Sequence, residues 1–393
     1  MTSADAPAGW LAPRGVLLHI GPHKTGTTAI QQSLAKARPR LAAQGVLNPG
    51  ADGQQRLAAL AVTSSRGMSG TRRATEDDWE RLVSDVRAGS TKKVVVSAEV
   101  LDEATDTVAR KVVSELGGER VQVVMTLRPL AKILPSAWQQ MIKNRLRLTY
   151  TEWLDIVLDA DSTHPVAEKF WRRHRHQDLL DRWLGIVGPD RMAVVVVSDA
   201  DRGALPRAFE DLIGVTPSTL AVADIRDNRG LTAAEIELVR QLNVAFHRRD
   251  WSAELYHRIV HLGCILPMQT RTPSPAEPRI ETPAGVVARA NEIAAAAAKH
   301  ITASGVRVVG ALDDLSAVVP DVTTTDQPSD QELVLSAAGL AATGVRHQIA
   351  TLLATGDEFR AVEQVGALRL AAVVAARGRR RLAARRQGEV NAD

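Results

Sequence analysis

A short loop of the chain combines glycine, threonine and one lysine at a spacing suited to phosphate binding. Residues 17–28 read Leu-Leu-His-Ile-Gly-Pro-His-Lys-Thr-Gly-Thr-Thr, an apolar run that leads through this loop into a helical pattern. A helix N-terminus offers unpaired backbone N–H groups and the positive end of the helix dipole, so it binds anions. Gly21 and Gly26 permit a tight turn, and Lys24 adds a mobile positive charge. The loop therefore predicts a phosphate site, with further hydroxyl donors from Thr25, Thr27 and Thr28.

The position of the lysine separates this loop from that of the nucleotide triphosphatases. In Gly-x-x-x-x-Gly-Lys-Ser/Thr, the lysine follows the second glycine. Gly21 and Gly26 keep that spacing, but Thr27 stands at the lysine position and Lys24 comes earlier. A kinase or nucleotide hydrolase using Mg-ATP remains an alternative, in which Asp199, after an apolar run, binds magnesium.

A second pair of residues indicates another anion site. Arg128 follows the apolar run 121–127, and Ser136 comes eight residues later. Ligands of open α/β sheets bind at the carboxyl ends of the strands, and a guanidinium with a hydroxyl is suited to holding a phosphate. Alone, such an Arg serves equally well as a partner for a surface acid. Together with the loop at 21–28, the pair indicates a ligand that carries two separate phosphates.

Composition sets outer limits on the class of protein. The chain has 393 residues, 45% of them hydrophobic and 24% charged, which is ordinary for a globular protein. Its single cysteine, Cys264, excludes an internal disulfide and fits a small buried residue in a reducing compartment. The first residues lack the basic and apolar regions of a signal peptide, and no apolar run reaches the roughly 18 residues of a membrane span. We expect a cytoplasmic protein.

Alternating strand and helix signals predict an α/β fold, with a parallel sheet of about four to five strands flanked by helices. A helix is expected to begin at Pro135, since proline is tolerated at a first helical position. The Gly-, Ser- and Arg-rich stretch 50–75 is expected to be a loop. The expected strands cover residues 16–20, 93–97, 121–127, 192–197 and 306–309.

Composition also suggests how the chain is divided. We expect a disordered N-terminus at 1–13, one catalytic domain at 14–320, a linker at 321–330, and an α-helical, basic C-terminal extension at 331–393. The net charge of +4 is modest but unevenly spread, and a basic tail can contact nucleic acid or anionic lipid or simply be a solvated, partly disordered end. Nucleic acid is not an expected partner. The arginines gathered in the extension make it a candidate for weak contact with an anionic membrane surface. The sequence does not indicate an oligomeric state.

The two phosphate motifs resemble those of the sulfotransferase superfamily that uses 3′-phosphoadenylyl sulfate (PAPS), a group with a P-loop NTPase-like fold. The resemblance is greatest to its bacterial branch, whose first strand ends His-Ile-Gly-x-His-Lys-Thr-Gly-Thr-Thr, and it spans roughly residues 14–320. It implies in-line transfer of a sulfuryl group from PAPS to a hydroxyl or amine of a glycan, lipid or small-metabolite acceptor. The product nucleotide is 3′-phosphoadenosine 5′-phosphate (PAP), and no metal is required.

The resemblance also implies roles for individual residues. Lys24 would follow the charge that grows on the leaving phosphate, and the rest of the loop would hold the 5′-phosphate and sulfonate. Arg128 and Ser136 would hold the 3′-phosphate. Asn228, Arg229 and Gly230 resemble a late loop that closes over the nucleotide, although the branch more often has serine at position 230.

The acceptor also needs a base to take its proton. Glu99 is the first candidate because it lies just beyond the expected strand 93–97, at the same sheet edge as Lys24 and Arg128. Capping a helix or pairing with a lysine is the alternative role for Glu99. His23 is the rival base, whereas His19 alternates inward on its strand and is expected in the core.

Two further alternatives concern the function as a whole. A degenerate, non-catalytic scaffold that binds PAP would keep the nucleotide site without transferring sulfate. The basic run 172–176 either attracts an acidic acceptor or forms a solvated helix face, as runs of charged residues often do.

Overall fold

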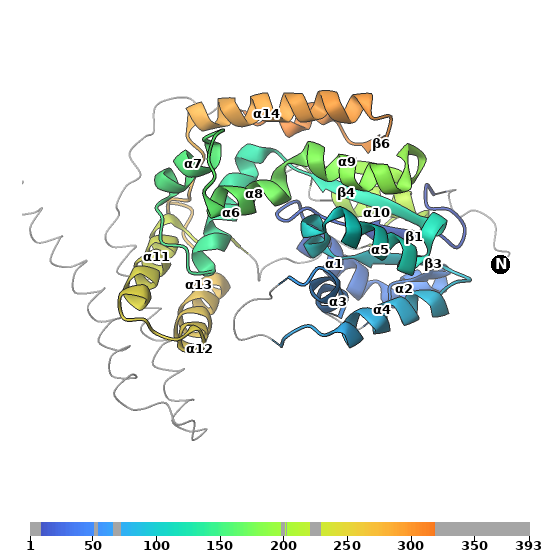
Figure 1. Ribbon diagram of the computed structural model, residues 1–393, viewed down its shortest axis with the longest axis horizontal. Helices are drawn as coiled ribbons and strands as arrows, with labels where there is room; N and C mark the ends of the chain where they lie inside the picture. The colour runs from blue at the N-terminus through green and yellow to red at the C-terminus, as the bar shows by residue number, and fades with distance from the viewer. Residues whose placement is uncertain are drawn as a thin grey trace, which may run out of the picture.

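The computed structural model describes residues 9–50, 54–65, 72–197, 201, 203–220 and 229–318, and these surround one parallel sheet (Figure 1). Its strand order is β2-β3-β1-β4-β5-β6. The predicted α/β class is confirmed, although the sheet has six strands rather than four or five. The strands are β1 (Val16–His19), β2 (Val46–Leu47), β3 (Lys93–Ser97), β4 (Val121–Leu127), β5 (Met192–Val196) and β6 (Arg307–Val309). The additional strand, β2, has two residues, too few to show a sequence period.

The register of the central strands decides where their following loops lie. β1 pairs in parallel with β3 on one side and β4 on the other, so that His19 stands opposite Ser97 and Val124. Since all three strands point the same way, the segments that follow them emerge at one edge of the sheet. This edge carries the glycine and threonine loop, Glu99 and Arg128.

Helices cover both faces of the sheet, which explains the continuous apolar runs of the strands. One face packs against α3 (Gln54–Val62), α4 (Glu76–Ala88), α5 (Asp106–Leu116) and α9 (His176–Val187). The other packs against α1 (Thr27–Lys36), α2 (Arg38–Ala43) and α10 (Ala204–Ile213). The expectation of a loop throughout 50–75 is wrong for α3, because Ala58, Leu60 and Val62 are buried in the first of these layers.

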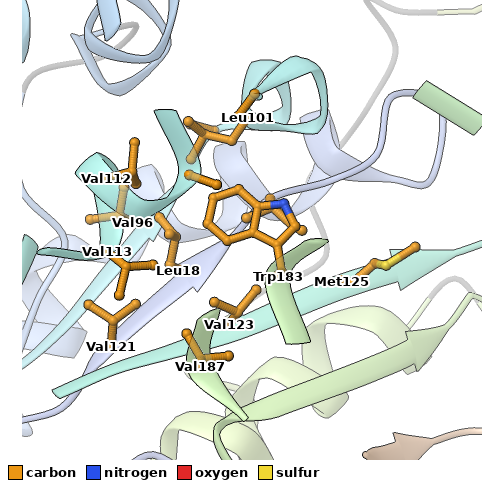
Figure 2. Packing of buried hydrophobic residues seen from close by; sticks show 14 of the residues in the cluster. Leu18, Val96, Leu101, Val112, Val113, Val121, Val123, Met125, Trp183 and Val187 are labelled. Atoms are coloured by element: carbon orange, nitrogen blue, oxygen red, sulfur yellow. The ribbon is translucent and has the colours of Figure 1, made fainter. Parts of the chain in front are cut away.

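A tryptophan fills the centre of the first layer (Figure 2). Trp183 of α9 is fully buried, and the close view shows its indole between Leu101 and the strand residue Val123. Burying such a side chain contributes about 1.5–3 kcal/mol or more to folding. The contact fixes α9 against the sheet, and with it the preceding helix, α8 (Pro165–His174).

A second group of helices packs beside the sheet around its own core, Trp153 and Phe170 among the buried residues (Figure 1). Helix α14 (Ala284–Ala303) joins the two parts, because its Val287 packs in this second core and its Ile301 in the first. The helices of this group are α6 (Leu130–Lys143), α7 (Tyr150–Leu158), α8, α11 (Ala233–Arg248), α12 (Ala253–Tyr256) and α13 (Leu266–Thr270), with a π-helix at His257–Ile265.

Helix α6 begins at Leu130, so the prediction of a start at Pro135 is wrong. A proline inside a helix cannot donate to the carbonyl four residues earlier, here that of Ala131. The buried hydroxyl of Thr282 donates to this carbonyl instead, at 2.6 Å. A contact 151 residues distant in sequence therefore replaces the missing backbone bond and allows α6 to continue through the proline.

Neither end of the chain is described completely. Residues 9–13, part of the segment expected to be disordered, pack on the domain: Leu11 is buried, and its N–H donates to Leu212 O at 2.7 Å. The expected linker and basic extension, residues 321–393, lie outside the described residues. Among the helices of the described ranges, none is both long enough and apolar enough to cross a membrane.

The Thr282 contact yields a prediction about stability. Thr282→Val should lower the free energy of unfolding by about 1–3 kcal/mol, since it leaves the Ala131 carbonyl without its donor. In a Pro135→Ala background, the new backbone N–H reaches that carbonyl, so the same change should cost less. Urea unfolding of the two single variants and the double variant measures this coupling. An equal cost in both backgrounds would contradict the role given to Thr282.

Candidate active site

The loop between β1 and α1 has a backbone geometry suited to binding an anion. Gly26, the N-cap of α1, has a left-handed backbone with φ of 87°, which glycine adopts without strain. Because glycine has no side chain to cap the helix, the first N–H groups of α1 remain available to a ligand. Lys24 also has a positive φ, 71°, a conformation that costs a non-glycine residue about 1–3 kcal/mol and is found often at functional sites.

A buried network of side chains supports the loop from below. His19 Nδ1 lies 2.8 Å from Ser97 Oγ, and its Nε2 lies 3.1 Å from Thr126 Oγ1. Thr126 in turn lies 2.6 Å from Thr25 Oγ1, which donates to the carbonyl of Pro22 at 2.6 Å. His19 is therefore a core residue as predicted. The hydroxyl of Thr25 is directed into the protein, towards Pro22 and Thr126.

The amine of Lys24 lies beside the second group of helices. It donates to Gln140 Oε1 of α6 at 3.2 Å. Burial lowers the pKa of Lys24, although the neighbouring Glu99 carboxylate opposes this shift. The lysine is thus held between the sheet edge and α6, where its amine can stay close to the negative charge of a bound anion.

Glu99 opens a short 3₁₀ turn (Glu99–Glu103) directly after β3 and is close to the loop. Its carboxylate accepts the hydroxyl of Thr27, and Glu99 Oε1 lies 3.8 Å from His23 Nε2. Burial alone would raise the pKa of Glu99, but His23, the Thr27 hydroxyl and Lys24 hold it below its usual value. The side chain therefore remains ionised at neutral pH, and it is tied to the first residue of α1.

His23 is held by an acid that the sequence reasoning missed. Asp102 Oδ2 lies 2.5 Å from His23 Nδ1 and accepts the backbone N–H of His23 at 3.0 Å. Asp102 is completely buried. The only sequence signal was its place three residues after Glu99, on the same side of a short turn, which no strand or helix period marks.

A pocket opens between α6 and α8 in front of the loop. It is lined by side chains of the loop and of the two helices, namely His23, Lys24, Ala137, Gln140, Met141, Asn144, Lys169, Phe170, Arg173 and His174. Arg173 comes from the basic run 172–176 and is bound to Glu103. His174 and His176 of that run are buried. The run is therefore more than a solvated face, because it contributes the pocket wall opposite α6.

The second predicted anion pair lies on the segment that links the sheet to α6. Arg128 is half-buried directly after β4, and Ser136 lies in the second turn of α6. The hydroxyl of Ser136 donates to the carbonyl of Ile133 in its own helix at 2.9 Å. Binding of a phosphate by this pair stays a prediction.

The late loop is placed against α6, but its arginine is occupied within the protein. Arg229 donates twice to the buried Glu235, at 2.8 and 2.9 Å, and also to backbone carbonyls. Gln139 of α6 bonds to both the N–H and the carbonyl of Leu231, which anchors Gly230 beside it. Asn228 and the alternative magnesium ligand Asp199 lie outside the described residues. A phosphate role for Arg229 would require a rearrangement of these contacts and stays a prediction.

Comparisons with known proteins give a distant likeness among solved structures. No family model matches the chain, and no curated protein matches it. Among solved structures, the chain is similar to the crystal structure of a sulfotransferase from Alicyclobacillus acidocaldarius. The match has 17% sequence identity and a TM-score of 0.39, and it covers 61% of this chain and 93% of that chain.

The buried histidines predict how stability depends on pH. Burial lowers the pKa of His19 and of His176 to about 4, so both are neutral in the folded protein where the unfolded chain, with pKa near 6.5, binds a proton. The free energy of unfolding should therefore decrease as the pH falls from 6.5 towards 4, by about 1.4 kcal/mol per pH unit for each histidine. In denaturant unfolding at pH 7, 6 and 5, the free energy of unfolding of His176→Gln should decrease less steeply than that of the wild type. Parallel curves for the two proteins would contradict this account.

Proposed function

We propose that this protein transfers a sulfuryl group from PAPS to a hydroxyl or amine of an acceptor, with PAP as the other product. The observation that carries the proposal is the position of Lys24. It lies inside the anion cradle after β1, two residues before the N-cap glycine, and its amine contacts α6. This placement differs from that of a triphosphatase lysine, and Thr27, which occupies that other position, is bound to Glu99.

The residues present suit a nucleotide with phosphates at both ends of its ribose. The free N–H groups at the start of α1 suit the 5′-phosphate and sulfonate, together with Lys24 and the Thr28 side chain. Arg128 and Ser136 follow the neighbouring strand β4 and would hold the 3′-phosphate. PAPS itself supplies an activated sulfur centre. The protein need only orient the acceptor, stabilise charge on the leaving phosphate and take one proton.

Two groups beside Lys24 are able to take that proton. Glu99 is ionised and lies at the sheet edge, and His23 lies 3.8 Å from it on the pocket side of the loop. The acceptor would enter through the pocket between α6 and α8, whose wall combines apolar side chains such as Phe170 with the cationic Lys169. The acceptor is therefore expected to present its hydroxyl or amine towards the Lys24 end of that pocket.

The proposal predicts a preference among nucleotides. In calorimetric titration, PAP should bind at least tenfold more tightly than ADP, because ADP lacks the 3′-phosphate held by Arg128 and Ser136. Arg128→Ala should weaken PAP binding by roughly tenfold or more and should reduce this preference. Lys132→Ala, which removes an exposed cation from the first turn of α6, is the matched control. Equal affinity for the two nucleotides, or turnover of ATP that depends on magnesium, would favour the kinase alternative.

A second prediction concerns Lys24. Lys24→Ala should lower the rate of transfer from labelled PAPS to hydroxylated acceptors by about 10²–10³-fold, the usual effect of losing a group that stabilises developing charge. PAP affinity should fall much less. Near-normal turnover in this variant would refute the role of Lys24. Binding of PAP by the wild type without transfer to any acceptor of a broad panel would instead indicate a non-catalytic scaffold.

A further inference from the structure

We propose that Asp102 positions His23, and that Nε2 of His23, rather than the Glu99 carboxylate, takes the proton of the acceptor. The inference rests on the proposed sulfuryl transfer and names the base of that reaction. Asp102 is a positioning residue in this proposal, and His23 is the catalytic residue that meets the acceptor.

Asp102 holds both the backbone and the ring of His23 through one oxygen. Its Oδ2 accepts the backbone N–H at 3.0 Å and lies 2.5 Å from Nδ1 of the ring. The aspartate side chain is fully buried, whereas that of His23 is 17% exposed. The ring cannot turn over without breaking a hydrogen bond to a buried carboxylate, which is costly. Burial raises the pKa of Asp102, and its contacts with His23 oppose this shift. Because Oδ2 already accepts the backbone N–H of His23, we infer that it accepts from the ring as well, which places the ring proton on Nδ1.

The other nitrogen of His23 is left on the reacting side. With Nδ1 engaged, Nε2 lies 3.8 Å from Glu99 Oε1, beyond hydrogen-bonding distance. His23 and Lys24 are adjacent in the loop, and both line the pocket between α6 and α8. An acceptor in this pocket would therefore meet the unprotonated Nε2 beside the amine that stabilises the leaving phosphate.

Glu99 is less suited to the same task. Its carboxylate accepts the Thr27 hydroxyl and is close to the Lys24 amine. Burial alone would raise its pKa, but the Thr27 hydroxyl, Lys24 and, once it is protonated, His23 hold the pKa below the usual value, so Glu99 is a weak proton acceptor at neutral pH. In this arrangement Glu99 balances the charge of Lys24 and fastens the first residue of α1.

The transfer step forms one bond to sulfur and breaks another. The acceptor oxygen or nitrogen bonds to sulfur while the bond from sulfur to the phosphate oxygen of the nucleotide breaks, and the electron pair of that bond stays on the phosphate oxygen near Lys24. The acceptor proton moves to Nε2 of His23. Asp102 stabilises the resulting imidazolium, as the acid of a catalytic triad does. The partly exposed ring afterwards releases this proton to solvent.

The ring nitrogens of His23 can be observed directly. We would label the histidines of the full chain with ¹⁵N and record long-range ¹H–¹⁵N correlations with PAP bound. The signals of His23 are those that disappear from the spectrum of His23→Gln. The expected wild-type spectrum shows a protonated Nδ1 and, at high pH, an unprotonated Nε2. In Asp102→Ala this preference should be lost. Glu103→Gln, which removes the acid next in sequence, is the matched control and should leave the tautomer unchanged.

Transfer rates provide the second readout. Rates are measured with labelled PAPS and the best acceptor of a hydroxylated panel, or with water where none is sulfated. The transfer rate of His23→Gln should be lower than that of the wild type by about 100-fold or more. The transfer rate of Asp102→Ala should be lower by roughly tenfold or more. In Asp102→Asn the backbone N–H of His23 should keep the amide oxygen in place and so preserve the tautomer, whereas loss of the carboxylate charge that stabilises the imidazolium should still lower the transfer rate. Glu99→Gln should keep at least a tenth of the wild-type rate. A greater loss in Glu99→Gln than in His23→Gln would overturn the assignment.

Failure of this inference is distinguishable from failure of the proposed function. If the wild type does not bind PAP in calorimetry, the proposed function fails. If PAP binds but Nδ1 of His23 is unprotonated in the wild type, Asp102 does not position the ring as proposed. The wild-type spectrum decides this even if Asp102→Ala does not fold, and circular dichroism of each variant identifies such a loss. An unchanged tautomer in a folded Asp102→Ala would also overturn the inference.

Discussion

The hydrogen-bonded column beneath the anion loop is the interaction on which the rest of the site depends. Ser97, His19 and Thr126 extend from three adjacent strands and meet in the sheet, and Thr25 joins them from the loop above. Unpaired, these polar groups would be expensive to bury, so each contact helps to maintain the others. The loop is thereby held in a conformation with a left-handed Lys24 and an uncapped helix start. A cradle formed in advance avoids much of the ordering cost of binding.

Above this column, basic side chains and carboxylates alternate over a short distance. Lys24 lies near Glu99, Glu99 near His23, and His23 against Asp102. None of these groups is fully solvated, and each lowers the cost of burying its neighbour. In the proposed reaction this arrangement separates two tasks: the Lys24 amine would meet developing negative charge, while the carboxylates hold the loop and the imidazole. A bound dianion would change this balance most at Lys24, where the loop approaches α6.

The helical layer completes the site from the other side. Helix α6 carries Gln140 towards Lys24 and Gln139 towards the late loop, and it forms one wall of the pocket. It continues through Pro135, where the hydroxyl of Thr282 makes the hydrogen bond to Ala131 that the proline cannot make. The opposite wall, α8, is fixed through α9 and its buried Trp183. The loop proposed to hold the nucleotide thus belongs to the sheet, and the pocket proposed for the acceptor lies where the sheet and the helices meet.

The sequence by itself determined the local features of this protein. The apolar runs at 93–97 and 121–127 predicted buried parallel strands, and the glycines of the loop predicted a turn into a helix, since backbone preference and hydrophobic period act over a few residues. Parallel pairing then allowed Glu99 and Arg128 to be expected at one edge. Only the tertiary structure decided which side chains meet across that edge. The hold of Asp102 on His23, the inward turn of Thr25 and the bond from Thr282 through the proline of α6 depend on residues 79 to 151 positions apart. Such pairings are selected by burial and by the need to satisfy every buried polar group, which leave no period in the chain.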